Sequence, residues 1–504
     1  MAIKKQDTEE NIEHMIGLPP LNLVVEFCKE LEREGIPYCH WKSNNAISRS
    51  ASGENDLDLL VDRSAVGRFT EIMYRMKFKE VRLDPEQEIP GIQDYYGYDQ
   101  ASGQLVHVHA HYQLTLGHDM TKNFRLQLEK PYIESATQQG LFKLPAPEFE
   151  FIVFVIRMML KHGTWDVVIA RQGSLSFGER QEFDYLFSRV DQQKIEQILV
   201  KYLPYIEPKL FDACFRSLFP RCSYWSRIKT GWLLQRSLQA HARRPEISDI
   251  FLKFSRRAMM SLKRRVFKLI PKGHIASGGA LVAIIGGDGA GKSTAIDELY
   301  HWLSPHLEIY KIHMGKPAWS LTTILLRGLL KAGRSVGLYP FTRAPEQYTN
   351  DLNVLVFPGY PWLIREICTA RDRYLTYLKA RRLANNGQLV ISDRYPLPQI
   401  KMMDSAQASR MTNNYHRNWF IRLMIELENK YYAPILLPDI LIVLKVDPEI
   451  AVQRKLDEDA ASVRARSGEI WEIEQCQLPA SIVDASQSKS KVLSELKGIL
   501  WSSL

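Results

Sequence analysis

The chain has 504 residues, more than one ordinary hydrophobic core accommodates, and its length predicts two to three domains. Apolar residues make up 45% and charged residues 24%, as in a soluble globular protein, and no run of about 18 uncharged apolar residues predicts a membrane span. The net charge of +9 suits phosphate-bearing substrates, an anionic membrane surface or nucleic acid, or simply a mildly basic enzyme.

The six cysteines are spread thinly and form no CxxC pair, which argues against a disulfide framework or a zinc site. The first residues, MAIKKQDTEENIEHMIGL, are polar and lack the apolar core of a signal peptide. These two features predict a reducing, cytoplasmic location.

The first predicted domain, residues 1–145, mixes helices and strands. LNLVVEFCKELEREG carries apolar residues at spacings of three and four and predicts a helix that Gly35 and Pro37 end. PYCHWKS and DLDLLVD then predict short strands, RSAVGRFTEIMYRMKF predicts a helix, and the alternating QLVHVHAHYQL predicts a further strand.

The second predicted domain, residues 146–277, is a helical connector. PEFEFIVFVIRMMLKHG and QQKIEQILVKYL show helical periodicity. The stretch from Lys253 to Lys272 holds eight Lys or Arg residues and no acid, and its apolar residues can form one stripe. It predicts either a basic amphipathic helix that rests on an anionic membrane or an acidic partner, or a connector helix packed on its own domains. In the first case the charged surface would comprise Arg256, Arg257, Lys263, Arg264 and Lys268.

The third predicted domain is residues 278–504. ALVAIIG, GQLVISD and DILIVLKVD are apolar runs typical of strands buried on both faces of a parallel sheet. Helical segments separate these runs, so the predicted fold class is α/β, with a doubly wound parallel sheet.

A complete GxxxxGK[ST] pattern follows the first of these strands and opens a helix. The backbone amides of such a loop wrap a phosphate, so side chains are nearly absent, and the helix directs its positive N-terminal end at the anion. We expect Lys292 to neutralise the β- and γ-phosphates and Ser293 to hold Mg²⁺, which makes ATP and Mg²⁺ the predicted cofactors. The predicted nucleotide-binding residues are Gly286, Gly287, Asp288, Gly289, Ala290, Gly291, Lys292, Ser293 and Thr294.

The loop GGDGAGKST resembles that of thymidylate kinases, which carry an acid ahead of AGKS. Four later segments resemble that family in the same order, and they are TARDRYLTYLKARRLANNGQLVISDRY, LPDILIVLKVDPEIAVQRK, VRARSGE and IVDASQSKSKVLSEL. The resemblance implies a P-loop kinase fold for the third domain.

The same resemblance implies roles around a phosphate acceptor. Asp288 would face the sugar of the acceptor nucleotide, and Arg373 would lie beside its base or phosphate. Asp393 would position Mg²⁺ or the attacking oxygen, and Arg394 would clamp the acceptor phosphate. The family's lid would supply two further catalytic arginines, Arg464 and Arg466. The arginines outside the DRY strand could instead be solvated surface charges.

The sequence departs from the thymidylate kinase pattern at the acceptor side. The family's Arg-Glu-Pro-like turn is replaced by IYKIHMGKP, where Lys316 could substitute for the arginine. The stretch 318–365 is long and rich in Leu, Pro and aromatic residues, and the lid lacks the usual Asp-Arg. These departures affect the predicted binding site of the acceptor and leave the predicted ATP-binding site unchanged.

In the first domain, GENDLDLLV resembles the nucleotidyltransferase motif, in which two strand aspartates hold metal ions. Alternation places Asp56 and Asp58 on one face, where they could bind the metals that bridge a nucleoside triphosphate. The preceding turn, HWKSN, would bring Lys42 and Ser43 to phosphate. The family's third carboxylate is missing from QLVHVHAHYQL, where His109 could replace it. A module that only binds, and a purely structural acidic edge strand, stay open as alternatives.

As a whole, the sequence predicts a two-headed enzyme that transfers the γ-phosphoryl group of ATP to a phosphorylated small molecule. A nucleoside monophosphate is the first candidate acceptor, and a sugar or sugar phosphate used in surface polysaccharide assembly is the second. An ATP-driven switch or assembly factor stays open as a different class. No nucleic-acid partner is expected, and a peripheral contact with an anionic membrane and a homodimer are left open.

Overall fold

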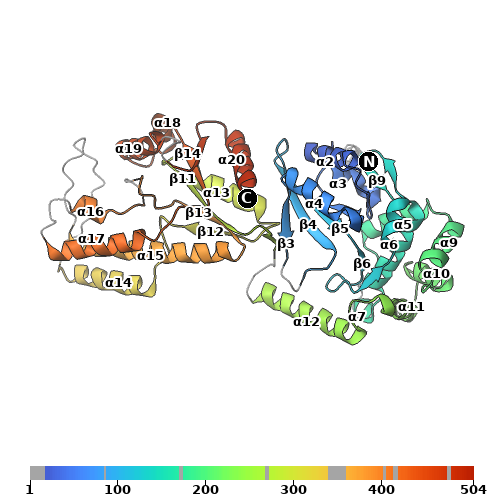
Figure 1. The fold of residues 1–504 in the computed structure, drawn as a ribbon. Helices are drawn as coiled ribbons and strands as arrows, with labels where there is room; N and C mark the ends of the chain where they lie inside the picture. The colour runs from blue at the N-terminus through green and yellow to red at the C-terminus, as the bar shows by residue number, and fades with distance from the viewer. Residues whose placement is uncertain are drawn as a thin grey trace, which may run out of the picture. The chain divides into compact units, whose positions relative to one another are not determined.

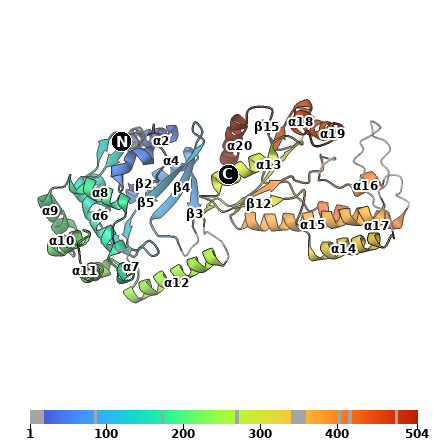
Figure 2. The same cartoon turned by 180° about the vertical axis from the view of Figure 1, so that it is seen from behind.

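The computed structural model describes residues 18–83, 87–169, 174–266, 272–338, 359–400, 404–412, 418–473 and 478–504. The chain divides into two compact units, residues 1–271 and 272–504, each with its own sheet and core (Figures 1 and 2). Lys268 of the basic stretch, and residues 339–358 of the long aromatic-rich segment, lie outside the described ranges. None of the helices in these ranges combines the length and the apolar character that crossing a bilayer requires.

A mixed sheet with the strand order β1-β2-β5-β4-β3 forms the centre of the first unit. Its strands are β1 (Tyr38–His40), β2 (Leu57–Val61), β3 (Lys79–Arg82), β4 (Ile92–Asp99) and β5 (Gln104–His111). β2 runs parallel to β5, and the other neighbouring pairs are antiparallel. The register sets Asp58 of β2 and Asp94 of β4 on either side of His109 in β5.

Two amphipathic helices, α2 (Asn22–Arg33) and α4 (Val66–Arg75), belong to the same hydrophobic cluster as this sheet. In α2 the buried residues recur at the predicted spacings of three and four, so the expected helix is confirmed; they are Val24, Phe27, Cys28 and Leu31. The remaining small elements are α3 (Ile47–Ala51), β6 (Leu114–Leu116), β7 (Phe124–Leu126), α5 (Glu129–Glu134), β8 (Thr137–Gln139) and β9 (Phe142–Leu144).

The helical part of the first unit surrounds α6 (Pro147–His162), which is buried along nearly its whole length. Its hydrophobic cluster includes Cys39, Trp41 and Leu60, so the sheet and these helices share one core. The helices around it are α7 (Trp165–Ile169), α8 (Phe177–Phe187), α9 (Gln192–Tyr202), α10 (Pro208–Ser217) and α11 (Tyr224–Ser237). The last helix of the unit, α12 (Glu246–Arg265), contacts Asp166 of α7.

The second unit contains a parallel sheet with the strand order β12-β13-β11-β14-β15, which confirms the α/β prediction for this part. The strands are β11 (Ala280–Gly286), β12 (Ile309–His313), β13 (Leu389–Asp393), β14 (Ile440–Lys445) and β15 (Ser481–Asp484), and β10 (His274–Ile275) precedes them. Helices α13 (Lys292–Leu303) and α20 (Lys489–Ser503) cover one face, and α15 (Tyr360–Asn385) covers the other (Figure 1). Both faces are therefore buried, as the continuous apolar runs predicted.

The remaining helices of the second unit are α14 (Leu321–Ser335), α16 (Ala408–Met411), α17 (Trp419–Tyr432), α18 (Pro448–Arg454) and α19 (Ala460–Trp471). Loops after β11 and β13 leave the sheet at the same edge, because the carboxyl ends of parallel strands point the same way. Ligands of open α/β sheets bind at this edge. The glycine-rich loop after β11 and the Asp393-Arg394-Tyr395 segment at the end of β13 both lie there.

Candidate functional site

The glycine-rich loop connects β11 to α13 and is enclosed by α18 and α19. Gly289 and Gly291 have positive φ angles of 76° and 80°, which residues with a side chain rarely adopt. A Cβ atom on Gly287 would lie 2.6 Å from the Oγ and 2.8 Å from the Cα of Ser467 in α19. Ser467 Oγ also donates a hydrogen bond of 3.2 Å to the carbonyl of Asp288. The lid segment VRARSGE is thus a helix that contacts the loop directly.

Lys292 is buried at the start of α13 and folds back over the loop. Its Nζ atom donates to the carbonyl oxygens of Gly286 at 2.9 Å and Gly287 at 2.8 Å. Burial lowers the pKa of Lys292 to about 8, although the nearby carboxylate of Asp288 acts in the opposite direction. An anion in the loop would stabilise the charged form, because an opposite charge offsets the cost of desolvation.

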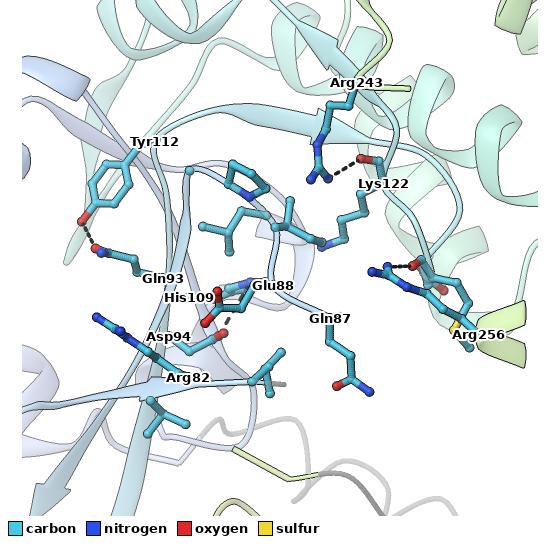
Figure 3. A pocket seen from close by; sticks show the side chains of 18 of the residues that line it. Arg82, Gln87, Glu88, Gln93, Asp94, His109, Tyr112, Lys122, Arg243 and Arg256 are labelled. Carbon is cyan, nitrogen blue, oxygen red and sulfur yellow. Dashed lines mark hydrogen bonds and ion pairs between the residues drawn. The ribbon is translucent and has the colours of Figure 1, made fainter. Parts of the chain in front are cut away.

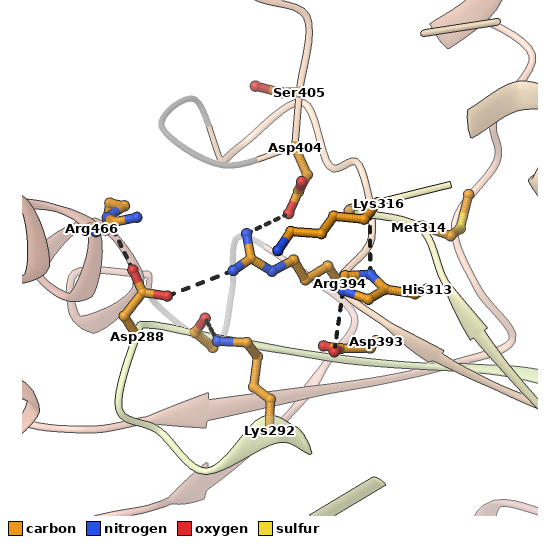
Figure 4. Close-up of polar contacts among 12 residues, drawn as sticks. Asp288, Lys292, His313, Met314, Lys316, Asp393, Arg394, Asp404, Ser405 and Arg466 are labelled. Atoms are coloured by element: carbon orange, nitrogen blue, oxygen red, sulfur yellow. Dashed lines mark hydrogen bonds and ion pairs between the residues drawn. The ribbon is translucent and has the colours of Figure 1, made fainter. Parts of the chain in front are cut away.

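Charged side chains from four segments meet in front of the loop (Figure 4). The buried carboxylate of Asp288 lies 3.0 Å from Nε of Arg466 and 3.7 Å from Nη2 of Arg394. Arg394 adopts a positive φ of 63°, and its Nη1 lies 3.5 Å from Oδ2 of Asp404. Lys316 extends into the same space (Figure 4). The cations of this cluster can bind phosphate oxygens in place of their present carboxylate partners.

Asp393 ends β13 beside this cluster. Its Oδ2 lies 3.8 Å from Nε2 of His313, while its buried Oδ1 has no hydrogen-bond partner among the described residues. A buried carboxylate oxygen without a partner is costly unless a cation or water meets it. Ser293 and Thr294 are exposed in the first turn of α13, so the hydroxyl of Ser293 is free of packing. These residues fit a hard cation such as Mg²⁺.

Arg373 lies deeper than the resemblance suggests and is held by protein groups. Its guanidinium donates to the backbone carbonyls of Met314 and Gly315 and to the hydroxyl of Tyr432. It also pairs with the carboxylate of Asp404 at 2.7 Å. Arg373 therefore supports the turn that carries Asp404, and Asp404 connects it to Arg394. Asp404 follows no recognisable motif, so sequence reasoning missed it.

The two lid arginines have different surroundings. Arg466 contacts Asp288 and also pairs with Glu458 at 2.8 Å. Arg464 lies on another side of α19, where it pairs with Glu449 at 2.6 Å, and both of these side chains are more than half exposed. Only Arg466 of this pair reaches the loop.

The two aspartates predicted to bind metal in the first unit, Asp56 and Asp58, are paired with basic side chains. Asp58 is buried, with Oδ1 2.8 Å from Nζ of Lys42 and 3.2 Å from Nδ1 of His109. Burial alone would raise the pKa of Asp58, but Lys42 and His109 hold it well below its usual range. Asp56 contacts Nδ1 of His107 at 2.8 Å. His107 and His109 are two residues apart on β5 and therefore share one face, so their partners Asp56 and Asp58 also lie on one face, as alternation predicts.

The ring of His107 lies between two carboxylates, because Asp94 contacts Nε2 at 2.9 Å from the other side. Burial opposes the charged form of His107, but the hydrogen bonds to Asp56 and Asp94 raise its pKa to about 9. His107 is therefore an imidazolium at neutral pH, and it neutralises part of the charge of these acids. Asp94 was missed by sequence reasoning, since IQDYYGYD carries no motif and only the strand pairing brings it to the histidines.

The backbone amides of the turn HWKSN, which we expected near phosphate, donate to carboxylates of the protein. The backbone amide of Ser43 donates to Oε1 of Glu182 at 3.0 Å, and that of Asn44 donates to Oε1 of Glu150 at 3.4 Å. Glu182 also pairs with Arg157 at 2.9 Å. Burial raises the pKa of Glu150 to about 7. Protein acids thus occupy the backbone donors that a phosphate would use.

A pocket of ≈ 1010 Å³ opens beside the sheet of the first unit, and Asp94, His109 and Lys122 line it (Figure 3). Burial lowers the pKa of Lys122. The lining also includes arginines from three parts of the chain, and these are Arg82, Arg243, Arg244 and Arg256. The pocket is large enough for a nucleotide-sized or drug-sized ligand.

Basic residues of α12 contact the first unit's own residues. Lys253 and Arg257 both pair with Asp166 at 2.6 Å, and Arg256 donates to the carbonyl of Met120 at 2.6 Å. This arrangement is the one expected of a connector helix packed on its own domain, although Arg264 is exposed.

The fold and the loop together define the second unit as an α/β protein of the P-loop type. No family model matches the chain. It is similar to the uncharacterized ATP-binding protein YghR of Escherichia coli K12, with 26% identity over 199 residues that span 37% of this chain and 73% of YghR. The uncharacterized ATP-binding protein YghS of the same strain is 25% identical over 190 residues, with 37% and 77% covered.

Among solved structures, the chain is similar to a thymidylate kinase from Candida albicans. The identity is 19%, the match covers 45% of this chain and 92% of that chain, and the TM-score is 0.28.

Proposed function

We propose that the second unit transfers the γ-phosphoryl group of ATP to a nucleoside monophosphate in a Mg²⁺-dependent reaction. The observation that carries this proposal is the meeting of Lys292, Arg394 and Arg466 with Asp288 at the mouth of a P-loop. Phosphoryl transfer requires mainly positioning and positive charge around the transferring group, and this cluster supplies both. The names of YghR and YghS, both ATP-binding proteins, support the choice of ATP.

In this proposal each residue has a separate task. The loop amides and Lys292 hold the β- and γ-phosphates, and Ser293 and Asp393 hold Mg²⁺, which neutralises charge on the phosphates. Arg394 exchanges its carboxylate partners for the acceptor phosphate, and Arg466 reaches the transferring group from α19. The acceptor oxygen attacks the γ-phosphorus, the bond to the β-phosphate oxygen breaks, and ADP leaves.

The acceptor class is tested by measuring ADP release from ATP and Mg²⁺ with the full chain and a panel of acceptors. We expect nucleoside monophosphates to raise ADP release well above the rate without acceptor. A response only to sugars or sugar phosphates would favour the second acceptor class, which the replacement of the family's arginine by Lys316 also favours. Equal ADP release with and without every acceptor would contradict kinase activity and favour an ATP-driven switch.

The two arginines of α19 offer a matched comparison. Arg466→Ala removes the cation beside Asp288, and we expect turnover to fall by about 10²–10³-fold, as for loss of one transition-state donor. Arg464→Ala removes an exposed ion pair with Glu449, and we expect turnover to change by less than about fivefold, since such pairs contribute about 0–1 kcal/mol. Steady-state kinetics of both variants check this. Equal losses would mean that α19 moves on binding and brings Arg464 to the site.

The first unit is proposed to be nucleotidyltransferase-like, with Asp56 and Asp58 as its acidic pair. The pocket beside Asp94 and His109 supports a ligand-binding role for this unit. The carboxylates at the HWKSN turn and the His107 imidazolium between Asp56 and Asp94 favour a module that binds over one that uses two Mg²⁺ ions.

A further inference from the structure

Three ligand atoms converge in the first unit, on two neighbouring strands. Oδ1 of Asp58 lies 3.2 Å from Nδ1 of His109 and 3.9 Å from Nε2 of His111, and the two histidine nitrogens are 3.3 Å apart. One atom of each residue faces the same small space, and the residues form the single such group of Asp, Glu, His and Cys in the described part of the chain. The parallel register of β2 and β5 sets this arrangement.

These distances match the edges of a metal coordination shell. A tetrahedral ion with ligands at about 2.0–2.1 Å has ligand atoms about 3.3–3.4 Å apart. Two of the three distances lie within about 0.2 Å of this value, and the third is about 0.5 Å longer. The atoms therefore need only small side-chain rotations to share an ion. Two imidazoles and one carboxylate form a donor set that suits zinc and other first-row transition metals better than Mg²⁺, which prefers oxygen.

The surroundings of the three residues also favour binding of a transition-metal ion. His111 is buried and its ring packs against that of Trp41, which holds its Nε2 toward Asp58 and His109. Asp94 lies 3.7 Å from Nε2 of His109, on the side of the ring opposite Asp58. A carboxylate in that place orients a metal-bound histidine. The neighbouring acid Asp56 is paired with His107, so it is not a competing ligand.

We propose that Asp58, His109 and His111 bind a single transition-metal ion of the zinc type. Three protein ligands leave one tetrahedral position for water or a ligand group, as in catalytic rather than structural zinc sites. His109 also lines the ≈ 1010 Å³ pocket, so a pocket ligand has access to this position. The proposal concerns the first unit alone and is independent of phosphoryl transfer by the second. Lys42, whose Nζ lies 2.8 Å from Oδ1 of Asp58, must move aside when the ion binds.

The test is a titration of the chelator-treated full chain with Co²⁺, followed by visible absorption. We expect a single equivalent to give the absorption bands of tetrahedral Co²⁺, and Zn²⁺ to remove them, while excess Mg²⁺ leaves them unchanged. Absence of these bands in the folded protein, or their removal by Mg²⁺ at concentrations comparable to those of Zn²⁺, would overturn the proposal.

Variants identify the ligands. Asp58→Asn and His109→Asn should each weaken Co²⁺ binding by more than the roughly 10–100-fold typical of outer-shell changes. His107→Asn is the matched control, because His107 lies on the same face of the same strand but contacts Asp56 and Asp94, and we expect it to keep the bands. Lys42→Met should bind Co²⁺ more tightly, because a competing cation is removed. Circular dichroism establishes folding in each case, and loss of the bands in His107→Asn or Lys42→Met would contradict the assigned ligands.

Discussion

Lys292→Ala should reduce ATP turnover by at least about 10²–10³-fold while leaving the fold of the second unit intact. In the proposed reaction this side chain contributes the cation that meets the β- and γ-phosphates. In the structure its Nζ donates to the loop carbonyls of Gly286 and Gly287. In the absence of nucleotide, burial of this ammonium is unfavourable, as its pKa of about 8 indicates. Removing it therefore relieves a desolvation cost, and we expect unchanged or slightly higher thermal stability without ATP.

Turnover is measured as ADP release, and ATP-dependent stabilisation is measured by thermal unfolding with and without nucleotide. Lys311→Ala is the control, because Lys311 pairs with Asp297 on the exposed surface of the same unit. The control should keep both turnover and stabilisation by ATP. Full turnover by Lys292→Ala would contradict the assignment of this loop as the phosphate site.

Glu182→Ala should destabilise the first unit by about 3–5 kcal/mol, the typical cost of leaving one partner of a buried ion pair alone. The side chain of Glu182 is 7% exposed and that of Arg157 is 17% exposed, and the two are in contact at 2.9 Å. The same carboxylate accepts from the backbone amide of Ser43, so the variant also leaves a donor of the HWKSN turn without its partner. The free energy of unfolding comes from the first transition to respond in urea titrations of the full chain.

Two comparison variants separate charge from packing. Glu196→Gln changes an exposed acid in α9 and should alter the free energy of unfolding by less than about 0.5 kcal/mol. Arg157→Met with Glu182→Leu removes both charges and should recover much of the loss, because well-packed apolar residues often replace a buried ion pair at little cost. A urea midpoint of Glu182→Ala equal to that of the wild-type protein would contradict the prediction. It would mean that the carboxylate of Glu150 already balances the charge of Arg157.

The local features of this protein could be predicted from its sequence. The P-loop is contiguous, and its glycines, its lysine and the apolar run ahead of it are all set by spacing along the chain. Alternation along a strand likewise placed Asp56 and Asp58 on one face, because successive side chains of a strand point to opposite sides. Helical periodicity predicted α2, since apolar residues at spacings of three and four fall on one side of a helix. The more continuous apolar run of α6 fits a helix that is buried on all sides.

The partners of these residues were decided only by the tertiary structure. Asp404 reaches Arg394 from a turn with no motif, and α19 brings Arg466 but not Arg464 to Asp288, although the two arginines are two positions apart. Residues at that spacing face different sides of a helix, so the direction of packing selects one of them.

The same holds for the first unit, where sequence reasoning named Asp58 and His109 but neither Asp94 nor a role for His111. Strand pairing joins β2, β4 and β5 across long sequence separations, and the register, not the spacing along the chain, determines which acid meets which histidine. A shift of one residue would turn the histidines to the other face of the sheet. The sequence by itself therefore determined which chemical groups are available in this protein, and the packing of distant segments decided which of them act together.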